Sequence, residues 1–287
     1  MTEISRNGRT VAVHDITPDA PADAPVVLMC HAAPGSGSFD PDPEATAAAG
    51  IRLIEVDRPG YGGSDPVKDD FATIGLAADD AAAVLADVLP PGGRAGVAGW
   101  SAGGRVALAL AARHPELVGR VAVIAAPAPD EEVPWYGDEN REMVAALRGL
   151  PPADAVAQLT AVFEGMLAGT GGDALLGLAG VADADADVLT APVRERLRAM
   201  LDAATVQGVT GMVADLAGYT LADWGFTPSQ VAADVLLAYG ADDALVPPAH
   251  GEWYRDRLPS AQLEIRAGVG HLVVVPVWSR VLAYLVR

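Results

Sequence analysis

Short apolar segments alternate with helical segments in the first half of the chain and again near its end, and this alternation restricts the fold more than any other feature. Segments of this kind are typical of buried parallel strands, and the helical stretches between them cover the two faces of the sheet. We therefore predict an α/β fold with a mostly parallel central sheet and helices on both faces. The predicted strands cover residues 10–16, 26–31, 51–57, 95–100, 121–126, 235–239 and 263–266, and the predicted helices cover 76–89, 105–113, 249–258 and 278–287.

The alternation stops at Pro127 and resumes after about Pro228. No convincing strand lies between these prolines, whereas apolar residues recur there at helical spacing. We predict that residues 1–127 and 229–287 form the α/β core and that residues 128–228 form an inserted helical cap or lid. The helices that this segment favours cover 140–150, 154–167, 193–204 and a glycine-broken stretch to Tyr219, with a loop candidate at 181–188.

The charge of the chain excludes several classes of partner. The 38 acidic and 19 basic side chains give a formal net charge of −19, and the basic residues form no long cluster. Nucleic acids and anionic membranes are therefore poor partners. The same negative field disfavours polyanionic substrates, unless one local pocket is cationic. We expect a small-molecule substrate, no nucleic acid, no membrane, and a monomer or homodimer.

The single cysteine and the apolar runs bear on compartment and cofactors. Cys30 lies in a short apolar run and cannot form an intrachain disulfide, so we expect a buried side chain on a strand. No histidine and cysteine cluster suggests structural zinc, and we expect neither a metal nor another cofactor. The N-terminus lacks an apolar signal core, and no uninterrupted apolar run is long enough to span a bilayer, so we expect a cytoplasmic protein.

The segment Gly99-Trp100-Ser101-Ala102-Gly103 matches the pattern G-x-S-x-G. In this pattern a tight turn from strand to helix holds the serine in a strained conformation with its hydroxyl exposed above the sheet. A predicted strand precedes Ser101 and an alanine-rich helix follows it, as the turn requires. Ser101 is therefore the candidate nucleophile.

A serine hydroxyl is a weak nucleophile at neutral pH and needs a base and an orienting acid. His271 lies in a glycine-rich loop after a predicted strand, which places it at the same edge of the sheet as Ser101. Asp242 and Asp243 follow another strand, and we choose Asp243 as the acid, with Asp242 in reserve and Asp130 as a possible displaced acid. The chain order of serine, aspartate and histidine fits this kind of hydrolase.

The remaining histidines have structural interpretations. A hydrolase of this kind also needs two N–H donors for the negative oxygen of its intermediate, and we expect two backbone amides to form this oxyanion hole. We interpret His14 and His114 as structural and His250 as a solvated helix residue. The loop HAAPG after the second predicted strand supplies one amide, that of Ala33, and the residue after the nucleophile, Ala102, supplies the other. His31 is interpreted as a hydrogen-bonding residue that shapes this loop.

Together these motifs resemble the α/β-hydrolase superfamily. The similar segments are HAAPGSG, DRPGYGGSD, GWSAGG, GADDALVP and GVGHL, which occur in the order of the family, and residues 127–228 match the position of its cap. The resemblance implies Ser101 as nucleophile, Asp243 as acid and His271 as base. The chain looks most similar to small bacterial serine esterases with an HGxPG-type loop, although Ala32 stands where that loop usually has glycine.

Neighbouring branches of the superfamily fit less well. Epoxide hydrolases and haloalkane dehalogenases use aspartate where this chain has Ser101, and the elbow of proline iminopeptidases differs from GWSAGG. An acyltransferase or a C–C bond hydrolase could use the same three residues, and a non-catalytic receptor with this fold is a further alternative. The intact set of three residues argues against the receptor.

We therefore predict a serine hydrolase that cleaves a small, mainly apolar carboxylic ester through an acyl-enzyme. The substrate is expected to be uncharged, because no arginine or lysine is evidently placed to pair with a carboxylate. The candidate substrate-binding residues of the helical segment are Trp135, Tyr136, Phe163, Met166, Met212, Tyr219 and Trp224.

Overall fold

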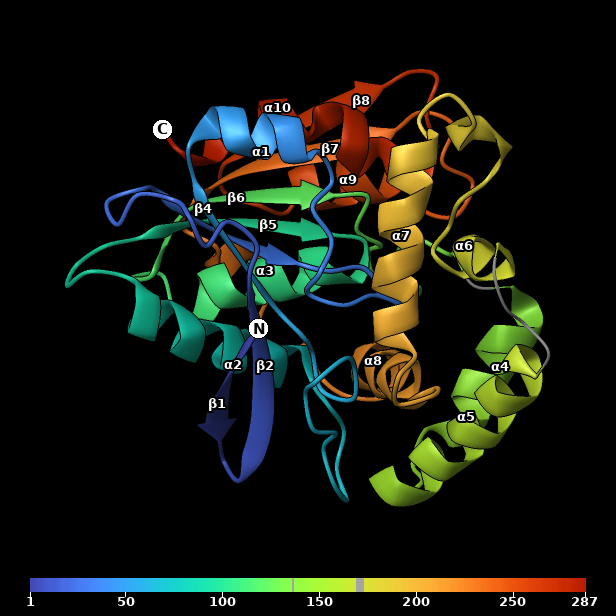
Figure 1. The fold of residues 1–287 in the computed structure, drawn as a ribbon. Helices are drawn as coiled ribbons and strands as arrows, with labels where there is room; N and C mark the ends of the chain where they lie inside the picture. The colour runs from blue at the N-terminus through green and yellow to red at the C-terminus, as the bar shows by residue number, and fades with distance from the viewer. Residues whose placement is uncertain (136, 169–172) are drawn as a thin grey trace.

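The central sheet has eight strands in the order β1-β2-β4-β3-β5-β6-β7-β8 in a computed structural model that describes residues 1–135, 137–168 and 173–287 (Figure 1). The strands β3, β4, β5, β6, β7 and β8 run parallel to one another, whereas β2 is antiparallel to both β1 and β4. The predicted α/β fold with a mostly parallel sheet is confirmed. The strands are β1 (Thr2–Arg6), β2 (Arg9–Asp15), β3 (Val26–Cys30), β4 (Arg52–Val56), β5 (Ala95–Trp100), β6 (Val118–Ile124), β7 (Asp234–Gly240) and β8 (Ala261–Arg266).

Strand β1 was not predicted, because its residues are polar and lie at an exposed edge of the sheet. It pairs with β2 through a hairpin turn at Asn7 and Gly8, both of which have positive φ. Asn-Gly is the residue pair that such two-residue turns favour.

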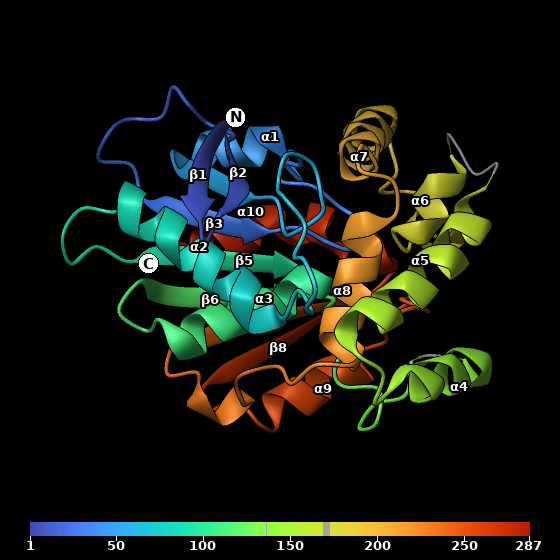
Figure 2. The same cartoon turned by 90° about the horizontal axis from the view of Figure 1, so that it is seen from below.

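Helices cover both faces of the sheet, as predicted (Figures 1 and 2). One core cluster lies between the sheet and α2 and α3 and includes Tyr254 of α9, and a second cluster lies between the sheet and α10. Cys30 is buried at the end of β3, and its burial raises the pKa of the thiol to about 12. The helices of this part are α1 (Pro43–Ala49), α2 (Ile74–Val88), α3 (Ala102–Arg113), α9 (Ala249–Arg255) and α10 (Val274–Leu285).

Two helices begin earlier in the sequence than predicted. Helix α3 begins at Ala102, directly after the turn at Ser101, and α10 begins at Val274 instead of at Trp278. Three of the first four residues of α10 are valines, which local propensity assigns to a strand. Val274 and Val277 are buried, and this burial outweighs that propensity.

The chain between β6 and β7 is helical, and its described residues contain no strand. These helices stand beyond the carboxyl ends of β5 and β6, where the arrowheads point toward α7 and α8 (Figure 1). A third apolar cluster joins residues of α4, α5, α7 and α8 to Tyr61 of the core. The helices are α4 (Asp138–Leu147), α5 (Pro152–Leu167), α6 (Ala174–Leu178), α7 (Ala191–Ala204) and α8 (Thr210–Thr220).

Short 3-10 turns complete the fold at Asp183–Asp185, Pro228–Gln230 and His271–Val273. In the three described stretches of the chain, no helix combines the length and apolar character that a membrane crossing needs.

Candidate active site

The turn at Ser101 has the strained geometry that the motif requires. Ser101 has φ 54° and ψ −124° and joins β5 directly to α3. A Cβ on Gly99 would lie 2.3 Å from the Gly103 carbonyl oxygen, and one on Gly103 would lie 2.1 Å from the Cys30 carbonyl oxygen. Because backbone atoms cannot move away as a flexible side chain can, only glycine fits these two positions. The strand and the helix therefore approach closely enough to hold Ser101 at the apex.

Three side chains far apart in the sequence meet at this apex. The Ser101 hydroxyl lies 3.0 Å from Nε2 of His271, and Nδ1 of His271 lies 2.7 Å from Oδ2 of Asp243. All three are buried, with exposed fractions of 7 % for Ser101, 3 % for Asp243 and 2 % for His271. The carboxylate accepts Nδ1–H, which leaves Nε2 free to accept the serine proton.

Of the three carboxylates that the sequence offers as the acid, only Asp243 bonds to His271. Its other oxygen accepts hydrogen bonds from the backbone N–H groups of Leu245 and Val246, at 2.9 and 2.8 Å, which fix its orientation. Asp242 instead accepts from the Gly268 N–H at 2.9 Å. Asp130 accepts from Arg141 Nε at 2.7 Å, outside this cluster.

The two predicted oxyanion donors line the same cavity as Ser101. Ala33 and Ala102 both border it, and neither backbone N–H has a hydrogen-bond acceptor among the described residues. The non-glycine residues with positive φ are Asn7, Asp69, Ser101 and Ala125 within the described part of the chain, so Ala32 needs no glycine-like conformation. The departure from the usual glycine therefore costs the loop no backbone strain.

His31 shapes the oxyanion loop, as the sequence predicts, and is not a second base. Its Nδ1 donates to the Ala32 carbonyl oxygen at 2.7 Å, and its Nε2 accepts from the Arg58 backbone N–H at 3.2 Å. Burial, and then the adjacent Arg58 guanidinium, lower the pKa of His31 to about 3. The imidazole therefore stays neutral and serves as a fixed hydrogen-bonding group.

Arg58 connects the oxyanion loop to the helical segment, a role that the sequence did not reveal. Its Nη2 donates to the Ala32 carbonyl oxygen at 2.8 Å, and its guanidinium binds both oxygens of Asp215 on α8, at 2.6 and 3.0 Å. Burial opposes the charge of Arg58, but Asp215 outweighs this effect and raises the pKa of the guanidinium. The pair is thus a buried, bidentate ion pair.

Asp185 anchors the loop that carries His271. The side chain is fully buried, and one of its oxygens accepts the backbone N–H groups of Gly270 and Leu272, at 2.9 and 3.1 Å. Trp100 fixes the same loop by donating Nε1–H to the His271 carbonyl oxygen at 3.1 Å. Asp185 lies in the stretch that the sequence marks as a loop candidate, and nothing in its periodicity points to this long-range contact.

The cavity above Ser101 is small and mainly apolar, with a volume of about 210 Å³. Four of the predicted substrate-binding residues line it: Trp135, Phe163, Met212 and Tyr219. The residues that the prediction missed are Pro34, Arg105, Pro127, Leu178, Asp215, Leu216, Leu245 and Val246.

Two other predicted substrate-binding residues, Met166 and Trp224, are absent from this lining. The Met166 side chain points largely to solvent, with 60 % of its surface exposed. Trp224 borders a neighbouring pocket instead. Tyr136 lies outside the described residues.

One arginine borders the cavity, although no arginine or lysine was predicted there. Arg105 borders the cavity together with Ser101. It is the fourth residue after Ser101, and residues spaced by four lie on one face of a helix. That spacing is the signal in the sequence that could have identified it.

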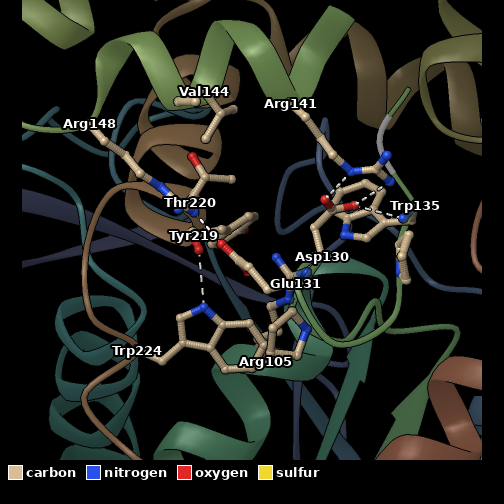
Figure 3. A pocket seen from close by; sticks show the side chains of 13 residues that line it. Arg105, Asp130, Glu131, Trp135, Arg141, Val144, Arg148, Tyr219, Thr220 and Trp224 are labelled. Carbon is tan, nitrogen blue, oxygen red and sulfur yellow. Dashed lines mark hydrogen bonds and ion pairs between the residues drawn. The ribbon is translucent and has the colours of Figure 1, made fainter. Parts of the chain in front are cut away.

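A second pocket of about 460 Å³ adjoins the cavity (Figure 3). Arg105, Trp135 and Tyr219 border both spaces and form the wall between them. On the far side of this pocket, Arg141 and Arg148 project from the region of α4, where Arg141 pairs with Asp130 and Arg148 pairs with Glu131.

His250 is not the solvated residue that the sequence suggests. It is fully buried, and its Nδ1 accepts the Ala128 backbone N–H at 3.0 Å. Burial, and then the nearby Arg105, lower its pKa to about 4. His14 and His114 lie away from the site and bond to Asp57 and Asp79.

No cluster of three or more histidine, cysteine or acidic side chains suited to a metal ion occurs within residues 1–135, 137–168 and 173–287. The site brings together a hydroxyl, an imidazole, a carboxylate and two backbone N–H groups.

Comparisons with known proteins agree with this geometry. The family described as alpha/beta hydrolase fold matches residues 25–275. A pimeloyl-[acyl-carrier protein] methyl ester esterase of Nitrosomonas europaea is 28% identical over 199 residues, which cover 67% of this chain and 69% of the relative. A protein of the same description from Aromatoleum aromaticum is 29% identical over 184 residues, covering 61% of this chain and 66% of the relative.

The solved structures show the same fold. The crystal structure of a hydrolase from Pseudomonas aeruginosa superimposes with a TM-score of 0.68 at 20% identity, covering 99% of this chain and 97% of that one.

Proposed function

The chain belongs to the α/β-hydrolase fold family, and we propose that it is a serine esterase in which Ser101, His271 and Asp243 cleave a small carboxylic ester. The observation that carries this proposal is the continuous chain of contacts from Ser101 Oγ to His271 Nε2, at 3.0 Å, and from His271 Nδ1 to Asp243, at 2.7 Å. Two curated relatives described as methyl ester esterases support ester hydrolysis as the reaction.

In the first half of the reaction, Ser101 Oγ attacks the ester carbonyl carbon while His271 Nε2 takes the hydroxyl proton. Asp243 accepts the Nδ1–H bond and stabilises the imidazolium that forms. The negative oxygen of the tetrahedral intermediate is bound by the N–H groups of Ala33 and Ala102. When the intermediate collapses, His271 returns the proton to the leaving alcohol, and the acyl group remains on Ser101.

In the second half, water takes the place of the alcohol. His271 removes a proton from the water as its oxygen attacks the acyl carbonyl, and the proton then passes to Ser101 as the carboxylic acid leaves. A cavity of about 210 Å³ suits a small acyl or alcohol group.

We also propose that residues 128–228 act as the cap of this site. Trp135, Phe163, Met212 and Tyr219 of this segment border the cavity, and Asp185 holds the loop of His271. These contacts support a role for the segment in excluding water and in selecting the substrate.

The decisive experiment compares Ser101→Ala with the unaltered enzyme on p-nitrophenyl butyrate. Loss of a covalent nucleophile is expected to lower kcat by roughly 10⁴- to 10⁶-fold. Ser38→Ala is the matched control, since Ser38 is an exposed serine that bonds to Ser36 and is absent from the cavity lining among the described residues. Full activity of Ser101→Ala would refute the assignment.

A fluorophosphonate probe followed by mass spectrometry tests the covalent step directly. The probe is expected to modify Ser101 in the unaltered protein and to leave Ser101→Ala unmodified. A protein that binds esters but is neither labelled nor hydrolytic would be a receptor and not an esterase.

A further inference from the structure

Arg105 is a buried cation, and one nitrogen of its guanidinium makes no hydrogen bond to the described residues. Only 2 % of the residue is exposed. Its Nε donates to the Pro127 carbonyl oxygen at 2.8 Å, and its Nη2 donates to the Ala128 carbonyl oxygen at 3.2 Å. Among the described residues, Nη1 has no hydrogen-bond acceptor, and it is not fully enclosed, so this nitrogen stays accessible from the adjoining space.

Three aromatic rings enclose this guanidinium (Figure 3). Its central carbon lies 4.9 Å from the ring centres of Tyr219 and Trp224 and 5.6 Å from that of Trp135. Such contacts offset part of the cost of removing the cation from water. The rings carry no net charge, however, so the positive charge of Arg105 is not neutralised.

The carboxylates of the two pockets are already bound by other arginines. Asp215 pairs with Arg58. Asp130 pairs with Arg141, and Glu131 pairs with Arg148. Within the described residues, no carboxylate lies within ion-pair distance of Arg105.

Burial of a cation without a carboxylate partner lowers the stability of the folded protein, so such a residue is expected only where it has a function. A buried arginine without an acidic partner is especially unusual in this chain, because its formal net charge is −19. The site therefore has a positive charge that remains available to a ligand.

The position of Arg105 places this charge beside the reaction. Arg105 follows Ser101 by one turn of α3, and both residues border the same cavity. The remaining lining is mainly apolar, so a substrate that reaches from the nucleophile to Arg105 would have an apolar body.

We propose that Arg105 binds a carboxylate of the substrate, so that the enzyme prefers esters that carry one free carboxylate over uncharged esters of the same size. This inference rests on the esterase function proposed above and names its substrate class. A single negative charge fits better than several, because the negative field of the whole molecule repels polyanions.

The test compares two matched series of methyl esters. One is the monomethyl esters of the straight-chain dicarboxylic acids from succinic to suberic acid. The other replaces the free carboxylate by a carboxamide, which has the same shape without the charge. For the best chain length, we expect kcat/KM for the carboxylate to exceed that for the carboxamide by roughly 10- to 100-fold, the usual range for a hydrogen bond to a charged group.

Arg105→Gln is expected to lower this ratio to about 1, and Arg105→Lys is expected to keep part of it. The ratio is measured within each variant and does not depend on how much of that variant is folded. A purely structural role for Arg105 would lower both activities and leave the ratio unchanged.

Arg141→Gln is the matched control, since Arg141 borders the neighbouring pocket and already pairs with Asp130. Its ratio is expected to equal that of the unaltered enzyme. Loss of the preference in Arg141→Gln, with the preference kept in Arg105→Gln, would move the anion site to the neighbouring pocket and overturn the proposal.

The unaltered enzyme alone can also overturn the proposal. A ratio of 1 or below at every chain length excludes a carboxylate site at Arg105, while Ser101-dependent hydrolysis of the carboxamide esters would leave the esterase function intact. Hydrolysis of neither series, nor of p-nitrophenyl butyrate, would instead refute the esterase function itself.

Discussion

The α/β core and the helical segment contribute to the site in different ways. The core supplies Ser101 directly after β5, and Asp243 and His271 in the loops after β7 and β8. The helical segment supplies Asp185 and Asp215, which bind core residues far from them in the sequence. The three residues of the proposed triad thus follow strand ends, whereas two of the groups that bind the loops around them come from the helical segment.

This difference implies that the insertion does more than cover the cavity. Asp185 fixes the backbone on both sides of His271, and Asp215 holds the arginine that binds the oxyanion loop. Changes in the core should therefore abolish chemistry with little loss of stability, while changes at the two aspartates should affect stability or alignment.

After Ser101→Ala, the largest effect is expected from Asp243→Asn in the core. An amide at this position can hold His271 in the wrong tautomer, and the loss of the orienting carboxylate typically lowers kcat by roughly 10⁴-fold. Asp242→Asn is the matched control, since that carboxylate binds the Gly268 N–H instead. Steady-state hydrolysis of p-nitrophenyl butyrate measures both. Equal losses in the two variants would mean that the loop as a whole, and not Asp243, supports the imidazole.

The next effect is expected at the junction of the two regions, from Asp215→Ala. Removal of this carboxylate leaves the buried Arg58 guanidinium without its partner, which typically costs about 3–5 kcal/mol of unfolding free energy. Chemical denaturation measures the change. Asp173→Ala is the control, because Asp173 pairs with Arg194 at the surface, where such pairs contribute about 1 kcal/mol or less. Similar losses in both variants would remove the distinction between buried and exposed pairs.

A smaller effect on rate is expected from Asp185→Ala. Without its acceptor, the loop of His271 can shift, and a displacement on the order of 1 Å can lower kcat by about 10²-fold. Asp185→Asn keeps an oxygen acceptor and is expected to retain most of the activity. Asp183→Ala serves as the control, since Asp183 is an exposed residue of the same 3-10 turn. A drop in KM alone, with kcat unchanged, would argue against a role in aligning His271.

The sequence predicted the core far better than the insertion, and the reason is physical. The strand before Ser101, the glycines around it and the order of the three reacting residues are local signals that need no knowledge of distant contacts. Asp185 and Asp215 give no such signal, because their function depends on which distant residues the fold brings to them. The composition of an insertion indicates helices but not which side of each helix faces the cavity.

The sequence did not predict the environments of two polar side chains, His250 and Arg105, for the same reason. The sequence predicts His250 as a solvated helix residue, yet α9 places it against the Ala128 N–H. Arg105 lies in the predicted helix at 105–113, and the structure shows that it borders the cavity together with Ser101. In both cases the tertiary structure decides the environment of a single polar side chain.

A buried carboxylate of the core with little donor support gives the smallest expected effect and sharpens the comparison with Asp185 and Asp215. Glu55 on β4 is fully buried, and the Phe39 backbone N–H offsets only part of the cost of burying it. Burial, and then the charges of Asp40 and Asp57, raise the pKa of this carboxyl well above 4.5. The folded protein therefore keeps a proton on Glu55 at pH values at which the unfolded chain has lost it.

The sign of the effect follows from this shift. As pH rises above the ordinary glutamate pKa, the unfolded chain releases the proton and the folded protein does not, so Glu55 reduces stability progressively until its own pKa is reached. Glu55→Gln removes that loss, and its gain in unfolding free energy should be near zero at pH 4 and clearly larger at pH 7. Thermal unfolding at both pH values measures it, with the exposed Glu3→Gln as control. A gain of the same size at both pH values would mean that Glu55 is ionised in the folded protein, because only a proton held by the folded state alone makes the gain grow with pH.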